Sequence, residues 1–285
     1  MVGILELLIA RGLDVAARVK IVRHQDQRYD LVRLERDGLL ELYQRYQGRP
    51  VFNCDYIVSC IGLENSHARL FGIYRVAGPP ERGKPQPPVF SHPDTEAPES
   101  ENYYYSLEAV PGFDDLNGRV VIHWGTSALA WHQWLVKPGT SNDKEVVEIL
   151  PRGYVREFPG YLDFAISFDE LAEIVRNPNA NREWHRMLSA VAGVYLIVDS
   201  TTGKQYVGSA SGENGIMGRW ANYVATGHGG NVQMVALMAA NAKCMHQFTF
   251  TVLRTLPRTL TKLEVIGYES LYKQKLGSRA FGLNS

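Results

Sequence analysis

The chain has 285 residues, of which 45% are hydrophobic and 21% charged, and its formal net charge is zero. This composition is typical of a globular protein with room for one large domain or two ordinary ones, and it excludes a disordered chain. No apolar run approaches the roughly 20 residues that span a bilayer, which excludes a membrane protein. The three cysteines are too few for a disulfide framework, so we expect a cytoplasmic protein.

The zero net charge hides an asymmetry along the chain. From residue 190 onward, nine Lys or Arg side chains stand against four acids, giving a net charge of +5, and the first 189 residues carry −5. Such a difference between halves indicates that the C-terminal part meets phosphate groups. An ordinary solvated basic surface explains the charge equally well.

Residues 1–160 predict a mostly β, barrel-like domain with a few helices. Two helical patterns, at 3–12 and 37–47, come before segments rich in β-branched and aromatic residues. Two of these segments, 55–62 and 68–78, are clear strand candidates. The proline-rich stretch at 79–98 is expected to be an exposed loop inside this domain.

The strand pattern at 55–78 loosely resembles the core strands of PUA-like barrels, the superfamily that includes EVE, SRA and YTH domains. Several of those domains flip a modified base into an aromatic cage. Trp124, Trp131 and Trp134 lie in a dense aromatic segment that could stack such a base, although core packing is favoured for any single ring. Arg23 and His24 could contact a phosphate or a base edge, or remain solvated surface.

Residues 161–189 predict a helical linker. Ser167 to Glu170 form a capping-box pattern that opens one helix, and a second helical pattern covers 181–190. We expect these helices to connect the first domain to a separate domain at 190–285, so that the whole chain belongs to the α+β class.

Residues 190–285 predict a small α+β unit in the order strand, turn, strand, helix, helix, strand, helix. Its first two strands are joined by a polar turn at 199–204. In a compact hairpin Tyr195 would face Tyr206 and Gly193 would face Gly208. The two phenols would then stand side by side, and the glycines would let a backbone or ligand approach.

The predicted helices of this unit contribute further polar candidates. Arg219 and Tyr223 are four residues apart and therefore share a helix face, and His228 and Asn231 lie in the glycine-rich turn that follows. His228 could contact DNA or cap the turn, and Lys204 could reach a phosphate.

Glu269 lies in a helix that opens with a capping box at 261–264. Its neighbours on the same face are apolar: Val265, Ile266, Tyr272 and Leu276. A carboxylate in such surroundings is costly unless it binds a metal, accepts hydrogen bonds or pairs with a cation. A structural ion pair with Lys or Arg is the alternative to a functional role.

Gly193-x-Tyr195, Tyr206-x-Gly208, Arg219, Glu269 and Asn284, in this order, resemble the GIY-YIG nuclease domain, with an antiparallel sheet flanked by helices. The resemblance covers residues 190–285 and departs from the pattern in its middle valines and in Tyr223, where many members have histidine. It implies hydrolysis of DNA phosphodiesters with Mg²⁺ or Mn²⁺.

The resemblance also implies roles for the residues of the set. Glu269 would be the metal ligand, Arg219 would stabilise the scissile phosphate, and Tyr195 would be the general base. Tyr206 would orient the nucleophile or the phosphate, and Asn284 would tie the last loop to the site. Either of these two could instead be structural.

The leading hypothesis is therefore a restriction endonuclease whose first domain recognises modified bases in double-stranded DNA. A sequence-specific restriction or repair nuclease that reads unmodified DNA is one alternative, and a non-catalytic nucleic-acid-binding protein is another. Because one active site cuts one strand at a time, we expect a homodimer, at least transiently on DNA.

Overall fold

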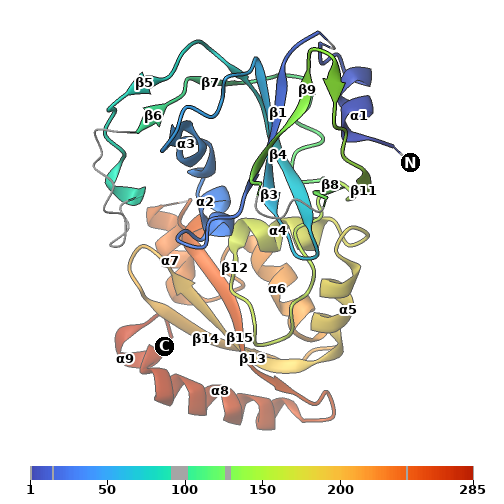
Figure 1. Cartoon of the computed structure of the whole chain (residues 1–285). Coiled ribbons are helices and arrows are strands. Elements are labelled where there is room, and N and C mark those ends of the chain that lie inside the picture. Colours follow the sequence, from blue (N-terminus) through green and yellow to red (C-terminus); the bar gives the residue numbers. More distant parts are fainter. Residues whose placement is uncertain (1, 15, 91–101, 126–129, 242, 285) are drawn as a thin grey trace. The chain divides into compact units, whose positions relative to one another are not determined.

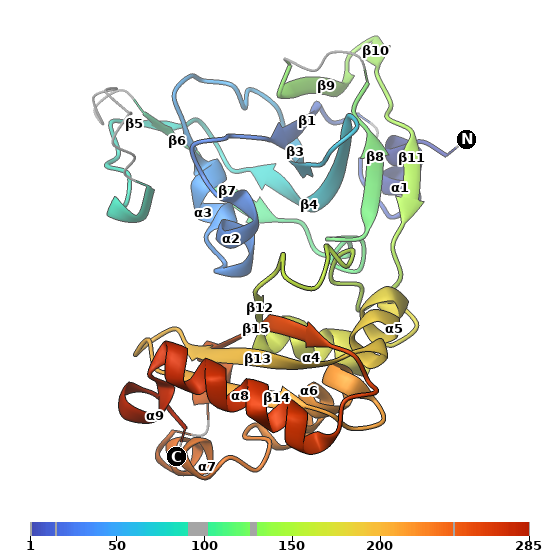
Figure 2. The same cartoon turned by 90° about the horizontal axis from the view of Figure 1, so that it is seen from below.

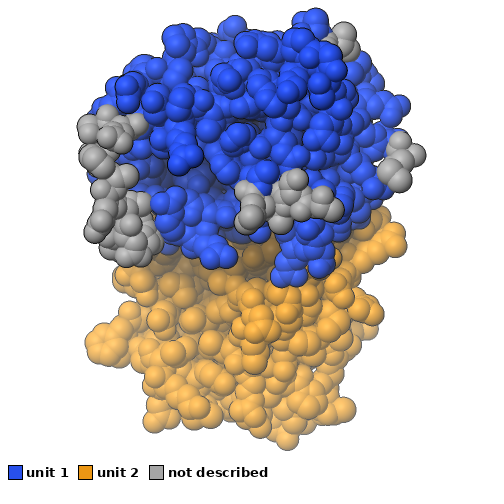
Figure 3. Space-filling model, viewed as in Figure 1, with its two compact units in different colours: residues 1–150 blue, residues 151–285 orange. Residues whose placement is uncertain are grey.

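The computed structural model describes residues 2–14, 16–90, 102–125, 130–241 and 243–284. The chain forms two compact units, residues 1–150 and residues 151–285, which Figure 3 colours separately. Each hydrophobic cluster found among the described residues lies wholly within one unit. Each unit therefore has a core of its own.

The first unit is built on an eight-stranded mixed sheet, seen in Figure 1 as a curled half-barrel. Its strand order is β10-β9-β1-β3-β4-β8-β11, with β7 paired to β4, and only β1 and β3 run parallel among these pairs. The strands are β1 Val19–His24, β3 Tyr56–Gly62, β4 His67–Val76, β7 Leu107–Ala109, β8 Val120–His123, β9 His132–Lys137, β10 Thr140–Ser141 and β11 Val146–Ile149. Because β10 and β11 end this order, the sheet of the described residues is open and not a closed barrel.

Short elements surround this sheet. They are the helices α1 Ile4–Ala10, α2 Leu31–Arg36 and α3 Leu40–Arg45, the 3₁₀ turn η1 Pro88–Phe90, and a small sheet of β2 Tyr46–Gln47, β6 Tyr103–Tyr104 and β5 Glu81–Arg82. The helices α1 and α3 fall inside the predicted ranges. The expected proline-rich loop contains β5 and η1, Phe90 is buried, and residues 91–101 lie outside the described part.

Strand β1 was not expected from the sequence, because it carries three charged or polar side chains. All six of its residues are buried, including Lys20, Arg23 and His24. The strand lies between β9 and β3 in the interior of the sheet, and apolar clusters cover both of its faces. Its polar residues are therefore part of the core and not of a solvated surface.

The second unit has a four-stranded antiparallel sheet in the order β12-β15-β13-β14. Its elements are β12 Ile166–Ser167, α4 Phe168–Arg176, α5 Arg182–Ala190, β13 Ala192–Asp199, β14 Gln205–Ala210, α6 Gly215–Thr226, α7 Val232–Ala240, η3 Cys244–Gln247, β15 Phe248–Leu256, α8 Lys262–Leu276 and α9 Ser278–Phe281. From residue 190 the order of strands and α-helices agrees with the predicted one as far as α8, and the structure adds η3 before β15 and α9 after α8. Strand β14 lies at the edge of the sheet.

The helices expected in a linker belong to the core of the second unit. Both capping boxes form, one at Ser167 and one at Thr261. Trp184 of α5 and Phe168 of α4 are almost fully buried in the same cluster as Tyr195, and β12 pairs with β15. Residues 161–189 are therefore integrated into this unit, because their apolar faces complete its core.

The β13–β14 hairpin has a different register from the expected one. Tyr195 faces Gly208 and Ile197 faces Tyr206, two positions further along β14. The Asp199 carboxylate accepts hydrogen bonds from the Thr201 amide (2.9 Å) and the Thr202 hydroxyl (2.7 Å), which keeps these residues in the turn. Because the shift is two residues, Tyr195 and Tyr206 remain on the same face of the sheet.

Different helices cover the two faces of this sheet. Tyr195 and Ile197 face the cluster that contains Trp220 of α6, whereas Val194 and Val207 face a second cluster with Val265 of α8. Figure 2 shows α8 running along β13 and β14. Among the described residues of the whole chain, no helix has the length and apolar character needed to cross a bilayer.

Candidate active site

Three side chains from two elements meet at the hairpin. The Arg219 Nε donates a hydrogen bond to the Tyr195 hydroxyl at 3.1 Å, and its Nη2 donates to the Tyr223 hydroxyl at 3.5 Å. The two phenolic oxygens are 3.2 Å apart and hydrogen-bonded to each other. The guanidinium also lies over the Tyr223 ring, 5.0 Å from its centroid. Tyr195 and Tyr223, which are 28 positions apart in the chain, thus share one hydrogen-bonded group with Arg219 inside an aromatic cluster.

Glycines make room for the two buried rings. A Cβ built on Gly208 would overlap the Tyr195 ring, and one on Gly229 would overlap the Tyr223 ring. Gly229 also has φ +55°, a conformation that favours glycine. The glycine of the Tyr206-x-Gly208 motif therefore receives the tyrosine of the Gly193-x-Tyr195 motif from the facing strand, which the predicted register had missed.

Tyr206 lies beside this cluster and not within its hydrogen bonds. Its ring meets the Tyr223 ring edge-on with a centroid distance of 6.4 Å, and the residue is half-buried. Tyr195 and Tyr223, in contrast, are fully buried. Tyr206 is therefore the member of the tyrosine group that solvent reaches.

Burial dominates the electrostatics of the cluster. It raises the pKa of Tyr195 well above the ordinary value of a phenol, and nearby Tyr206 raises it further, whereas Arg219 and the hydrogen bond with Tyr223 act in the opposite direction. Burial likewise raises the pKa of Tyr223. It would lower the pKa of Arg219, but the phenolic oxygens of Tyr195 and Tyr223 outweigh this and hold that pKa above its usual range. At neutral pH the cluster is one cation with neutral phenols.

Glu269 is held by two partners that the sequence analysis did not name. Its Oε2 accepts a hydrogen bond from the Ser209 hydroxyl, and its Oε1 forms an ion pair with the Lys273 Nζ at 2.7 Å. The side chains of Glu269 and Lys273 are only 17% and 15% exposed. Of the predicted same-face neighbours, Val265 is buried, whereas Ile266 and Leu276 are exposed. The ion pair considered as the alternative is therefore present.

The tyrosine–arginine cluster and the Glu269 carboxylate lie on opposite faces of strand β14, where they contact neighbouring residues of the strand. Gly208 receives the Tyr195 ring on the face covered by α6, and Ser209 contacts Glu269 on the face covered by α8. Because β14 is the last strand of the sheet, only this one strand separates Gly208 and the Tyr195 ring from Ser209 and Glu269.

Asn284 anchors the C-terminal segment to the same strand. Its side chain accepts a hydrogen bond from the Val207 amide and donates one to the Val207 carbonyl, both at 2.8 Å, and the residue is 2% exposed. This pair satisfies backbone groups on the free edge of β14. Asn284 thus ties the last loop to the hairpin, one residue from Gly208.

The other polar candidates of the second unit lie around turns. Asn231 is the N-cap of α7, where its side chain accepts from the Met234 amide at 2.8 Å. His228 Nδ1 accepts from the Gly230 amide at 2.9 Å, so it stabilises the glycine-rich turn. Lys204 is exposed after the hairpin turn.

Three candidates of the first unit, Arg23, His24 and Trp124, are buried, and for Trp124 this is the core packing that was favoured for a single ring. Trp124 is fully buried, donates to the Ala130 carbonyl at 3.0 Å and lies under the Arg23 guanidinium at 4.9 Å. His24 contacts Gln44 and Ser59 in the core, and burial lowers its pKa to about 4.

Trp131 and Trp134 are half-buried, and the Lys20 Nζ lies 4.7 Å from the Trp134 ring centroid. Of the three tryptophans, these two keep part of their surface accessible.

Glu269 is the carboxylate of this region that could hold a divalent cation. The described residues contain no group of three or more His, Cys, Asp or Glu side chains that could hold a metal ion. Mg²⁺ is commonly bound by one or two carboxylates together with waters and substrate phosphates. The single Glu269 carboxylate fits this mode, provided that Lys273 gives up the Oε1 it now contacts.

Comparisons with known proteins find similarity to two solved structures. One is a mutant of the catalytic domain of intron endonuclease I-TevI, with 22% identity and a TM-score of 0.27 over 33% of this chain and 92% of that chain. The other is the catalytic domain of homing endonuclease I-TevI, with 22% identity and a TM-score of 0.26 over 33% of this chain and 96% of that chain. No protein-family model matches the chain. No curated protein matches it either.

Proposed function

We propose that the second unit hydrolyses phosphodiester bonds in DNA. The observation that carries this proposal is the convergence of Arg219, Tyr195 and Tyr223 at one point, beside an edge strand whose other face contacts Glu269. A guanidinium hydrogen-bonded to a buried phenol favours the phenolate form, which can act as a base, and the same guanidinium can bind phosphate. Tyrosines used only for core packing would not need this cation.

In this proposal each residue has a separate task. Tyr195, in its phenolate form, takes a proton from water as the water oxygen bonds to phosphorus, and the P–O bond to the leaving sugar oxygen breaks, with that oxygen taking a proton from solvent. Arg219 stabilises both the phenolate and the charge that develops on the scissile phosphate. Tyr223 and Tyr206 fix the positions of the base and the substrate. Glu269 would hold Mg²⁺ or Mn²⁺, which when bound supplies positive charge to the phosphate oxygens.

The test is cleavage of plasmid DNA by the full chain with Mg²⁺ or Mn²⁺. Arg219→Ala and Glu269→Ala should each lower the rate at least about 100-fold, since removing a single charge-stabilising group typically costs that much. Glu213→Ala is the matched control, because Glu213 is exposed in the segment before α6. Absence of cleavage by the wild type on every substrate would refute the proposal and leave a non-catalytic binding protein.

We further propose that the first unit recognises modified bases and that the protein is a restriction enzyme for modified DNA. Support comes from the half-buried rings of Trp131 and Trp134, of which Trp134 lies beside the Nζ of the buried Lys20. Stacking of a flipped base on one ring contributes about 1–3 kcal/mol.

Cleavage of DNA that carries 5-methylcytosine, 5-hydroxymethylcytosine or glucosylated bases, but not of plain DNA, is the expected result. Discrete fragments from plain DNA would favour the sequence-specific alternative instead.

A further inference from the structure

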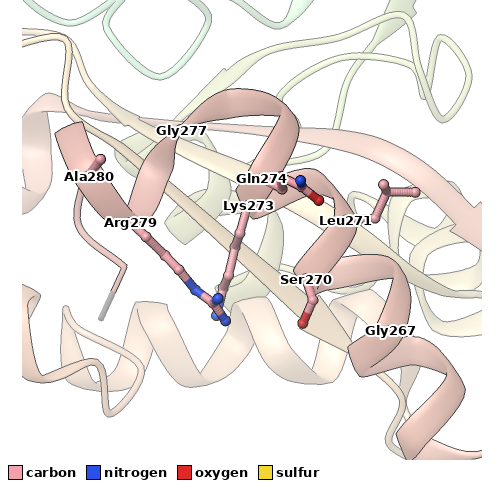
Figure 4. Close-up of a pocket in the computed structure, with 8 residues that line it drawn as sticks. All are labelled: Gly267, Ser270, Leu271, Lys273, Gln274, Gly277, Arg279 and Ala280. Atoms are coloured by element: carbon pink, nitrogen blue, oxygen red, sulfur yellow. The ribbon is translucent and has the colours of Figure 1, made fainter.

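We propose that the groove between α8 and α9 binds a backbone phosphate of the DNA, next to the bond that is cut. This inference rests on the proposed nuclease function and deepens it. The groove has a volume of about 540 Å³ and is shown in Figure 4. Its polar lining consists of Ser270, Lys273, Gln274 and Arg279, and its remaining lining residues are Gly267, Leu271, Gly277 and Ala280.

The backbone turn at the end of α8 builds this groove. Gly277 ends the helix in the left-handed conformation with φ +61°, and α9 starts directly after it. The chain therefore folds back, and Arg279 comes to line the same groove as Lys273 of the last helical turns. In Figure 4 the tips of these two side chains point toward one another.

Two converging cations repel each other unless an anion lies between them. No acidic residue is among the eight that line the groove. Lys273 has its counter-charge at Glu269, outside the lining, whereas no ion pair is seen for Arg279 among the described residues. With the hydroxyl of Ser270 and the amide of Gln274, the groove offers donors suited to phosphate oxygens.

Lys273 connects this groove to the proposed active site. It lies one helical turn after Glu269 and contacts its Oε1, which is the oxygen that a metal ion would need. A phosphate bound in the groove would give the Lys273 ammonium a second partner and free that oxygen. The groove would thus hold a phosphate that flanks the scissile one, and sequence would play no part in this contact.

The experiment measures binding separately from cleavage. A fluorescent 20-base-pair duplex is titrated with the full-length protein in EDTA, at KCl concentrations from 50 to 200 mM, and the anisotropy gives the affinity at each salt concentration. Loss of one phosphate contact lowers the slope of log affinity against log salt by about 0.9. Arg279→Ala should therefore show this smaller slope and a weaker affinity at low salt.

Lys275→Ala is the matched control, because Lys275 is an exposed cation of α8 outside the groove lining. It should leave the slope unchanged. Arg279 is itself exposed, so its substitution should not alter the melting temperature. Equal slopes for the wild type and Arg279→Ala would overturn the inference, while cleavage by the wild type would keep the nuclease proposal intact.

A second arm separates DNA from small anions. Thermal unfolding is recorded with inorganic phosphate in place of DNA. If inorganic phosphate stabilises the wild type but not Arg279→Ala, while both bind the duplex with the same salt slope, the groove is a small-anion site and the assignment to DNA is wrong. A wild type that neither binds nor cuts any DNA overturns both proposals.

Discussion

Tyr195 presents a buried hydroxyl to Arg219 and Tyr223, and its protonation controls the proposed chemistry. Because burial raises the pKa of this phenol above its ordinary value, the neutral form dominates at every pH below about 10. The phenolate fraction then grows with pH, so the single-turnover cleavage rate should rise about tenfold for each pH unit between about pH 6 and 9.

Tyr195→Phe should reduce the rate at pH 8 by about 10²–10⁴-fold, the usual contribution of a positioned base. The variant keeps the ring and its packing, so its melting temperature serves as the control for folding. A flat pH profile, or a Tyr195→Phe variant as active as the wild type, would remove Tyr195 from the role of base.

Gly208 provides a second test, because the absence of a side chain at this position leaves room for the Tyr195 ring. Gly208→Ala should displace the ring and lower the free energy of unfolding by about 1–3 kcal/mol, the usual cost of overpacking. Gly212→Ala is the control, since a Cβ at Gly212 meets nothing within 4 Å. Urea unfolding of the two variants measures the difference. If they unfold at the same urea concentration, the contact between Gly208 and Tyr195 does not constrain the fold.

Single residues also show where sequence reasoning ends. Arg219 and Tyr223 could be placed together because helical spacing fixes their relative position, and they do meet. Lys273 follows Glu269 by four residues, so the same rule would have found the ion pair. Ser209 could not have been found in this way, because its contact with Glu269 depends on how α8 packs across β14.

At the scale of elements, local signals gave reliable boundaries. The capping boxes at Ser167 and Thr261 open helices α4 and α8, and Gly227 and Gly277 end α6 and α8 in the left-handed conformation. Elements whose existence depends on tertiary context were missed. Strand β1 is polar in sequence yet fully buried, and the two residues of β12 form a strand only through β15.

The C-terminal segment bonds to the outer edge of strand β14: the Leu283 amide donates to the Gln205 carbonyl at 2.7 Å, and the side chain of Asn284 bonds to both backbone groups of Val207. Asn284→Ala should leave these buried groups without partners and lower the free energy of unfolding by about 1–3 kcal/mol. Asn222→Ala, on the exposed surface of α6, should change it by less than about 0.5 kcal/mol. Hydrogen exchange at the Val207 amide should accelerate in the first variant alone, and unchanged protection there would show that other contacts hold this edge.

At the scale of the whole molecule, the division into units could be predicted from sequence only approximately. The change of pattern near residue 160 was visible, but the structure places residues from 151 onward in the second unit. Helical segments of moderate length look the same in a linker and in a core, because amphipathic periodicity does not identify the surface that an apolar face covers. For α4 and α5 that surface is the sheet that carries Tyr195.

Two truncations test this assignment. A fragment of residues 151–285 should fold alone, because all members of its two hydrophobic clusters are included. A fragment of residues 190–285, the extent suggested by the motif resemblance, should not form a rigid core. It lacks Phe168, Trp184 and Leu188, and burying one such side chain contributes roughly 1.5–3 kcal/mol. It also lacks β12, which leaves the β15 edge open to pairing with other chains.

Circular dichroism in the near ultraviolet and thermal unfolding should show a cooperative transition for the longer fragment only. Equal melting temperatures for the two fragments would mean that α4 and α5 are dispensable and that residues 161–189 act as a linker after all.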